Sequence, residues 1–104
     1  MSDLTGADRI IQERIRQINK EEWSAGHDDE YEEDELSWAA VCYAAPSQVF
    51  RYYENELDDP WPWVANWDKR DKHDRIRQLE IAGALIAAEI DRLLRKKTEQ
   101  QETE

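Results

Sequence analysis

Apolar residues near the start of the chain recur at intervals of three and four, which is the spacing of one face of an α-helix. The residues in this row are Ile11, Ile15 and Ile18. Thr5 and Asp8 precede them and fit the aspartate form of a capping box, in which each side chain accepts a hydrogen bond from the other residue's backbone N–H group. The sequence therefore predicts a helix that begins near Thr5, and Trp23 is expected to end it against the core.

A second row of apolar and small residues predicts a helix from about residue 29 to residue 45. Its buried face is expected to contain Leu36, Ala39, Ala40 and Tyr43. Residues 26–29 are typical of a turn and a helix N-cap, and Pro46 is expected to end the helix because proline lacks a backbone N–H group. A short helix capped by Ser47 is predicted to follow, with the apolar residues Val49, Phe50, Tyr52 and Tyr53.

Residues 57–70 are predicted to form a structured loop rich in tryptophan and proline, because Pro60 and Pro62 interrupt any regular helix there. The last helix is predicted over residues 71–96. Its apolar face alternates steps of three and four, the spacing of a coiled-coil seam, through Ile76, Leu79, Gly83, Ile86, Ile90 and Leu93. A helix this long exceeds what a small domain covers by itself, so we expect part of the seam to bind a second copy of the chain.

These elements predict an all-α fold, a small bundle of three long helices and one short helix, with the tryptophan- and proline-rich loop before the last helix. Residues 1–95 are expected to form one domain, because 104 residues provide one hydrophobic core, and the polar residues 96–104 are expected to fray. The single cysteine, Cys42, excludes an intramolecular disulfide and cannot complete a zinc site with the two histidines. No apolar run approaches the roughly 20 residues that span a bilayer, so we expect a cytoplasmic protein without a membrane partner.

The formal net charge is -11, which is expected to prevent nonspecific binding to nucleic acid. Nine carboxylates lie between residues 21 and 35, without a lysine or arginine among them. Two sets of these acids fall three or four residues apart, the spacing of one helical face, and are candidate ligands for a magnesium ion: Asp28, Asp29 and Glu32, or Glu32 and Glu35. The same acids are also typical of a solvated helix face, and both interpretations stay open.

Three tryptophans of the predicted loop run into a short basic segment, and this pattern is the main candidate for a binding site. The tryptophans are Trp61, Trp63 and Trp67, and the cations are Lys69, Arg70, Lys72 and Arg75. A nucleotide needs flat aromatic faces for its base and cations for its phosphates. The alternative interpretation is that the tryptophans close the open end of a helical core and the cations balance the acidic helix.

Several stretches of the chain carry a family resemblance. They are residues 10–17 (Ile-Ile-Gln-Glu-Arg-Ile-Arg-Gln), Trp23, residues 27–31 (His-Asp-Asp-Glu-Tyr), residues 35–40 (Glu-Leu-Ser-Trp-Ala-Ala) and residues 79–94. Over residues 10–45 and 74–95, the chain resembles small bacteriophage and prophage proteins whose helices are similar to the MazG-like all-α nucleoside triphosphate pyrophosphohydrolases. The resemblance implies a dimer or tetramer and a magnesium site with a Glu-Glu-x-x-Glu set on one helix and a Glu-x-x-Asp pair on a later one. This chain has Asp28-Asp29-x-x-Glu32 for the first set, and its second set is broken at Gly83.

The broken acidic pattern favours binding over hydrolysis. The first hypothesis is therefore a phage-encoded protein, oligomeric and located in the cytoplasm of the host bacterium, that binds a nucleotide and sequesters a nucleotide-derived signal of a host defence system. The first alternative is a MazG-like, magnesium-dependent pyrophosphohydrolase. The second alternative is an acidic inhibitor that binds a host protein and imitates the charge of a nucleic acid with residues 21–35.

Overall fold

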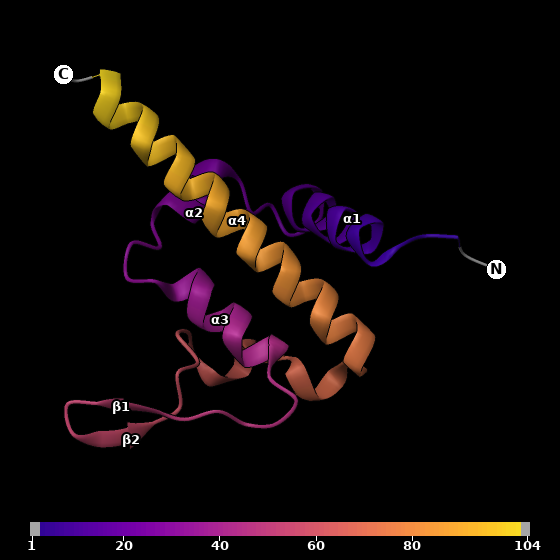
Figure 1. The fold of residues 1–104 in the computed structure, drawn as a ribbon, viewed down its shortest axis with the longest axis vertical. Coiled ribbons are helices and arrows are strands. Elements are labelled where there is room, and N and C mark those ends of the chain that lie inside the picture. Colours follow the sequence, from indigo (N-terminus) through magenta and orange to yellow (C-terminus); the bar gives the residue numbers. More distant parts are fainter. Residues whose placement is uncertain (1–2, 103–104) are drawn as a thin grey trace.

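The computed structural model of the protein describes residues 3–102 and is mostly helical (Figure 1). Its helices are α1 (Gly6–Asn19), α2 (Ala25–Asp29), α3 (Glu35–Ala44) and α4 (Arg75–Glu102). An antiparallel hairpin of β1 (Arg51–Tyr53) and β2 (Glu56–Asp58) lies between α3 and α4 in the sequence. Two short 3-10 helices, Ala65–Trp67 and Arg70–Lys72, lead into α4. The prediction of a mostly helical fold is confirmed, and the β-hairpin was not predicted.

The long helix α4 is the element on which the other helices pack (Figure 1). α3 and α1 contact different sides of it, and α2 contacts its C-terminal half through the Arg95–Asp29 ion pair. The core comes from α3 and α4: Leu36, Ala39, Ala40, Tyr43, Ile81, Ala82, Leu85 and Ala88. Its four α3 residues are those that the sequence pattern predicts. The alanines on both helices allow close backbone packing without voids.

Helix α1 has the predicted cap, and its row of isoleucines lies on the outer side of the helix. The Thr5 hydroxyl accepts from the Asp8 N–H group at 3.2 Å, and the Asp8 carboxylate accepts from the Thr5 N–H group at 3.0 Å. The isoleucine row faces outward, with exposed fractions of 57%, 51% and 43% for Ile11, Ile15 and Ile18. The buried residues of α1 are Glu13 and Gln17. Helix α1 therefore turns a polar side toward the interior, where Glu13 and Gln17 line a pocket.

The predicted helix from 29 to 45 is interrupted, and residues 26–29 do not form a turn. Ser24 caps the short helix α2 by accepting from the His27 N–H group at 3.2 Å. The chain then leaves the helical path until Asp34, which has a left-handed φ of 63° and precedes α3. The acids of this segment lie three and four positions apart, and like charges at that spacing disfavour a continuous helix.

The predicted short helix after Ser47 is wrong, because this segment enters the β-hairpin. Arg51 pairs with Asp58, and Tyr53 pairs with Glu56. The two-residue turn consists of Glu54 and Asn55, with positive φ values of 52° and 68°, as a type I′ turn requires. Aromatic residues favour extended backbone when such a turn is available. Leu57 and Asp58, the first two residues of the predicted loop, belong to β2.

Helix α4 begins four residues after its predicted start and continues through the residues that were expected to fray. Residues 96–102 are helical, and the Thr98 hydroxyl donates to the Leu94 carbonyl at 3.1 Å. Lysine, glutamine and glutamate have good helix propensity, which accounts for the extension. Residues 103 and 104 of the predicted tail lie outside the described residues. Within residues 3–102, no helix combines the length and apolar character needed to cross a membrane.

Gly83 allows the close approach of α1 to α4. A β-carbon at this position would lie 2.6 Å from Cδ1 and 2.8 Å from Cγ1 of Ile10, distances that side-chain carbons do not reach. The residue that interrupts the acidic pattern of α4 is therefore a packing residue in this fold.

Gly83→Val should lower the free energy of unfolding by about 1–3 kcal/mol, because its methyl groups would overlap Ile10. Ile10→Ala removes the overlapping atoms. The double variant should therefore lose less free energy of unfolding than the two single variants lose in total. Urea unfolding of the four proteins measures this coupling. Strict additivity would show that the two residues do not pack together.

Candidate functional site

A pocket of about 470 Å³ opens between α1, α3, the tryptophan-rich loop and the first half of α4. Six aromatic rings line one part of it: Trp23, His27, Tyr31, Trp61, Trp63 and Trp67. Tyr43, Leu36 and Leu85 connect this wall to the core. We call this cavity the aromatic pocket. It brings together all three tryptophans that the sequence marks as candidates for stacking.

The rings form a continuous series around the aromatic pocket. Trp23 and His27 are stacked, with ring centroids 5.9 Å apart and planes within 6°. Tyr31 contacts His27 and Trp63, each at a centroid distance of 5.2 Å. Trp63 lies between Trp61 and Trp67, at 5.4 Å and 6.4 Å. Trp61 and Trp63 pack against the core, whereas Trp67 is 55% exposed. The two interpretations of the tryptophans, core plug and binding surface, therefore apply to different members of the set.

The polar floor of the pocket consists of Glu13 and Gln17, both of which are buried. The Glu13 carboxylate accepts from Arg16 Nε at 2.7 Å and from Arg77 Nη2 at 2.6 Å. Burial opposes ionisation of Glu13, but these hydrogen bonds outweigh it and lower the pKa of the carboxyl below its ordinary value. The floor thus carries a stable carboxylate whose charge two arginines already balance.

Two buried polar atoms at the pocket lack a hydrogen-bond partner among the described residues. Gln17 donates from Nε2 to Glu13 at 3.2 Å, but its Oε1 atom has no partner. The Trp63 Nε1 atom is also buried and unpaired. Buried polar groups in folded proteins are nearly always satisfied by protein, water or ligand. Both atoms are enclosed by protein, so they have no surface that a molecule in the pocket could contact.

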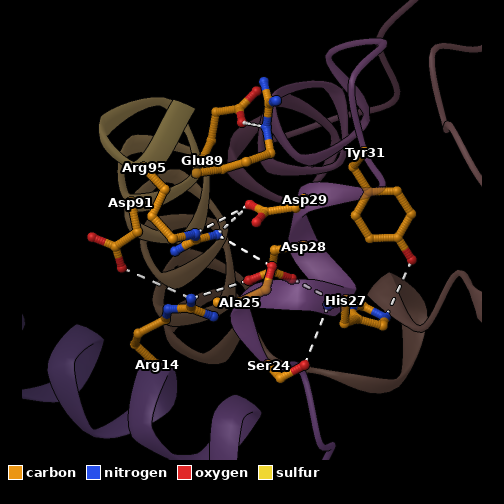
Figure 2. A network of polar contacts seen from close by, with 11 residues as sticks. Arg14, Ser24, Ala25, His27, Asp28, Asp29, Tyr31, Glu89, Asp91 and Arg95 are labelled. Carbon is orange, nitrogen blue, oxygen red and sulfur yellow. Dashed lines mark hydrogen bonds and ion pairs between the residues drawn. The ribbon is translucent and has the colours of Figure 1, made fainter. Parts of the chain in front are cut away.

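Helix α2 holds the His27 ring at the pocket through the network of contacts in Figure 2. Asp28 is completely buried and accepts from Arg14 Nη2 and His27 Nδ1, each at 3.1 Å. The Tyr31 hydroxyl lies 3.4 Å from the other nitrogen of the His27 ring. Arg95 on α4 donates to Asp29 at 2.7 Å and so joins α2 to the long helix (Figure 2). The two aspartates thus act in this structure as anchors for α2.

The four acids proposed as magnesium ligands do not converge. Asp28 and Asp29 pair with the cations just described, Glu35 accepts from the Glu33 N–H group at 2.5 Å, and Glu32 is exposed. Within residues 3–102, no three acidic, histidine or cysteine side chains lie together in a group that could hold a metal ion. Magnesium binding remains a prediction that draws no support from this geometry.

The structure brings only part of the predicted basic segment to the pocket. Lys69 lines it, whereas Lys72 does not. Arg70 pairs with Asp68 and lies 5.4 Å from the centroid of the Trp61 ring. Arg75 donates to the carbonyls of Tyr43 and Ala45 and so caps the C-terminal end of α3.

Sequence reasoning missed most of the polar residues of the pocket, among them Glu13, Arg16, Gln17 and Arg77. Glu13 and Gln17 are four residues apart on a helix that also carries an isoleucine row, so the spacing allowed either side to face inward. Arg77 lies in the basic segment, two positions beyond the last cation that was selected.

No protein-family model, no curated protein and no solved structure matches this chain. The MazG-like relationship therefore remains a prediction, and the function is argued from the pocket.

Acidification should destabilise the protein partly through Glu13. Because its folded pKa is lowered, ionised Glu13 stabilises the fold above the ordinary value of 4.5, and that stability is lost as the pH falls through the folded pKa. Glu13→Gln should be less stable at pH 7 by about 1–3 kcal/mol and should lose less stability between pH 5 and lower pH, where other acids still titrate. Chemical unfolding at several pH values gives both curves. Parallel curves would contradict the role of the Glu13 charge.

Proposed function

We propose that this protein binds a nucleotide or a nucleotide-derived small molecule in the aromatic pocket. The observation that carries the proposal is the combination of indole rings with the cationic side chains of Lys69 and Arg77 in the lining of one cavity of about 470 Å³. A volume of this size accommodates a small ligand rather than a polymer. The tryptophan faces suit a heterocyclic base, which stacks on aromatic rings through its π-face.

Cations on one part of the pocket wall suit the phosphates. Lys69 and Arg77 line the pocket, and Arg77 also forms an ion pair with Glu13. The net charge of -11 repels extended polyanions over the whole molecule, whereas a few local cations attract one small anion. This contrast favours a mononucleotide or a short nucleotide signal over a nucleic acid.

Binding without hydrolysis agrees with the geometry of α4. Glu80, at which the family's later acidic pair would begin, accepts from both Arg9 and Arg77 at 3.1 Å. The next position of that pattern is Gly83, which packs under Ile10. We therefore infer that the function is to sequester a nucleotide-derived signal of a host defence system, in a protein of the phage origin that the sequence resemblance implies. A pyrophosphohydrolase would need its metal ligands from elsewhere.

An acidic inhibitor of a host protein is the second candidate. Glu30, Glu32, Glu33 and Asp34 are all exposed in the segment between α2 and α3. An exposed row of carboxylates can attract a basic protein surface.

Identification of a co-purifying ligand separates these functions. The protein is incubated with cell nucleotides, washed and denatured, and the released compounds are identified by mass spectrometry. Intact nucleotide supports sequestration, and monophosphate with pyrophosphate supports hydrolysis. A protein that releases no nucleotide but retains a basic host polypeptide supports the inhibitor.

Trp67→Ala should weaken nucleotide binding by about 1–3 kcal/mol, the usual contribution of one stacked base. It should leave the melting temperature almost unchanged, because Trp67 is 55% exposed. Tyr52→Ala, on the hairpin and 80% exposed, is the control that should change neither quantity. Calorimetric titration and thermal unfolding measure the two effects. Equal affinities for the Trp67 and Tyr52 variants would remove Trp67 from the site.

We also propose that two copies of the chain associate through α4. The predicted seam is exposed in the single chain except at Gly83, which Ile10 covers, and Ile86, Ile90 and Leu93 are exposed to 50%, 52% and 50%. The molecule measures 47 × 46 × 21 Å, and its radius of gyration is 15.1 Å. A compact chain of this length has a radius of about 13 Å. A flat monomer with an exposed seam of coiled-coil spacing suits a second copy, because the same stripe can pair with itself.

Ile86→Asp should yield a folded monomer. The side chain is half-exposed in the single chain, so the new charge is buried only when a second copy covers it. Sedimentation at tens of micromolar should show dimer or larger for the unaltered protein and monomer for Ile86→Asp. Tyr52→Asp, on the hairpin, should sediment like the unaltered protein. A monomeric unaltered protein would refute the association.

A further inference from the structure

We propose that the ligand of the aromatic pocket carries a single negative charge and that Lys69 binds it. Among nucleotide derivatives, this describes a phosphodiester of a nucleoside rather than a monophosphate or a triphosphate. The inference rests on the proposed nucleotide pocket and names the class of its ligand.

The arginines and glutamates at the pocket neutralise one another. Arg16 donates from Nε to Glu13 at 2.7 Å and from Nη1 to Glu21 at 2.8 Å. Arg77 donates from Nη2 to Glu13 at 2.6 Å and from Nη1 to Glu80 at 3.1 Å. The complete network contains as many cations as anions: Arg9, Arg16, Arg77, Glu13, Glu21 and Glu80. It therefore has no excess positive charge for a ligand.

Lys69 is the lysine or arginine of the pocket lining that lies outside this network. It is exposed, and it forms no ion pair within residues 3–102. Its ammonium group lies at the end of a flexible chain of four carbons, so it can reach a phosphate in the cavity. Trp67, two residues earlier, places an exposed indole on the same loop. This loop thus offers both a stacking face and one positive charge.

A second negative charge on the ligand would have no cation to pair with. Arg70, the next residue, is paired with Asp68, and Lys72 does not line the pocket. The two histidines of the lining add positive charge only when they are protonated. An unpaired charge in a partly enclosed site is costly, and the net charge of -11 adds a repulsion that grows with the charge of the ligand. The charge balance of the pocket therefore favours a phosphodiester.

The test varies the charge of the phosphate on a constant base. The intact protein is titrated calorimetrically at about pH 8, at which histidine is ordinarily neutral, and without divalent metal ions. The ligands for each of the four common bases are the nucleoside, its 5′-methyl phosphate, its 5′-monophosphate and its 5′-triphosphate. In this order they carry no charge, one negative charge, about two and more than two.

The methyl phosphate, which is the phosphodiester, should bind about tenfold more tightly than the nucleoside, because it gains a charged hydrogen bond from Lys69. It should also bind about tenfold more tightly than the triphosphate, with the monophosphate between the two. Lys69→Gln should bind the methyl phosphate no more tightly than the nucleoside. Lys72→Gln removes the same charge from an exposed residue outside the lining and should keep the preference of the unaltered protein.

The outcomes separate this inference from the proposed function. A monophosphate or triphosphate that binds as tightly as the methyl phosphate of the same base would overturn the single charge and leave the nucleotide pocket intact. A Lys69→Gln variant that keeps the preference would do the same. Absence of binding for every ligand of the series, together with no nucleotide released from the protein after exposure to cell extract, would overturn both.

A phosphodiester can come from a cyclic mononucleotide or from a dinucleoside monophosphate, and each carries one negative charge. Titration with both, on the base that binds most tightly, identifies the source of the diester. Preference for either one over the triphosphate of that base supports the proposal.

Discussion

The orientation of α1 depends on one buried carboxylate. Glu13 accepts from Arg16 in the same helix and from Arg77 in α4, and these bonds turn the polar side of α1 toward the interior. Two consequences follow on opposite sides of the helix. The pocket receives a floor of Glu13 and Gln17, and the isoleucine row is left on the surface. With the isoleucines inside, the cavity would be filled by apolar side chains and would have no polar group for a ligand.

The aromatic wall needs a second support, which α2 provides. The buried Asp28 holds Arg14 and His27, and Arg95 connects the same helix to α4 (Figure 2). The His27 ring is thereby placed against Trp23 and Tyr31, and the series of rings continues into the tryptophan-rich loop. Stacking faces, a polar floor and nearby cations come from four separate segments, so the pocket exists only in the folded chain.

The spacing of residues along the chain predicts where helices form better than it predicts which side of each helix faces the interior. The cap at Thr5 and the α3 core face depend on neighbouring residues and were predictable from spacing. The hairpin was missed because its turn uses Glu54 and Asn55 with positive φ, and the usual glycine signal is absent. The three tryptophans were found as a cluster, but Gln17 and Arg77 were not, because their roles depend on contacts between distant parts of the chain. Spacing makes Asp28 a candidate metal ligand but cannot reveal its pairing with Arg14, which lies 14 positions earlier in the chain.

The central claim, that the aromatic pocket binds a nucleotide, is tested most directly by the indole N–H signals in a ¹H–¹⁵N correlation spectrum. Each of the five tryptophans contributes one such signal. Trp38 provides an internal reference, since it packs under Arg51 and does not line the pocket. On titration with the four nucleoside monophosphates, the account predicts that the signals of Trp63 and Trp67 shift while that of Trp38 stays in place. Indole signals that all remain unchanged at millimolar nucleotide would contradict it.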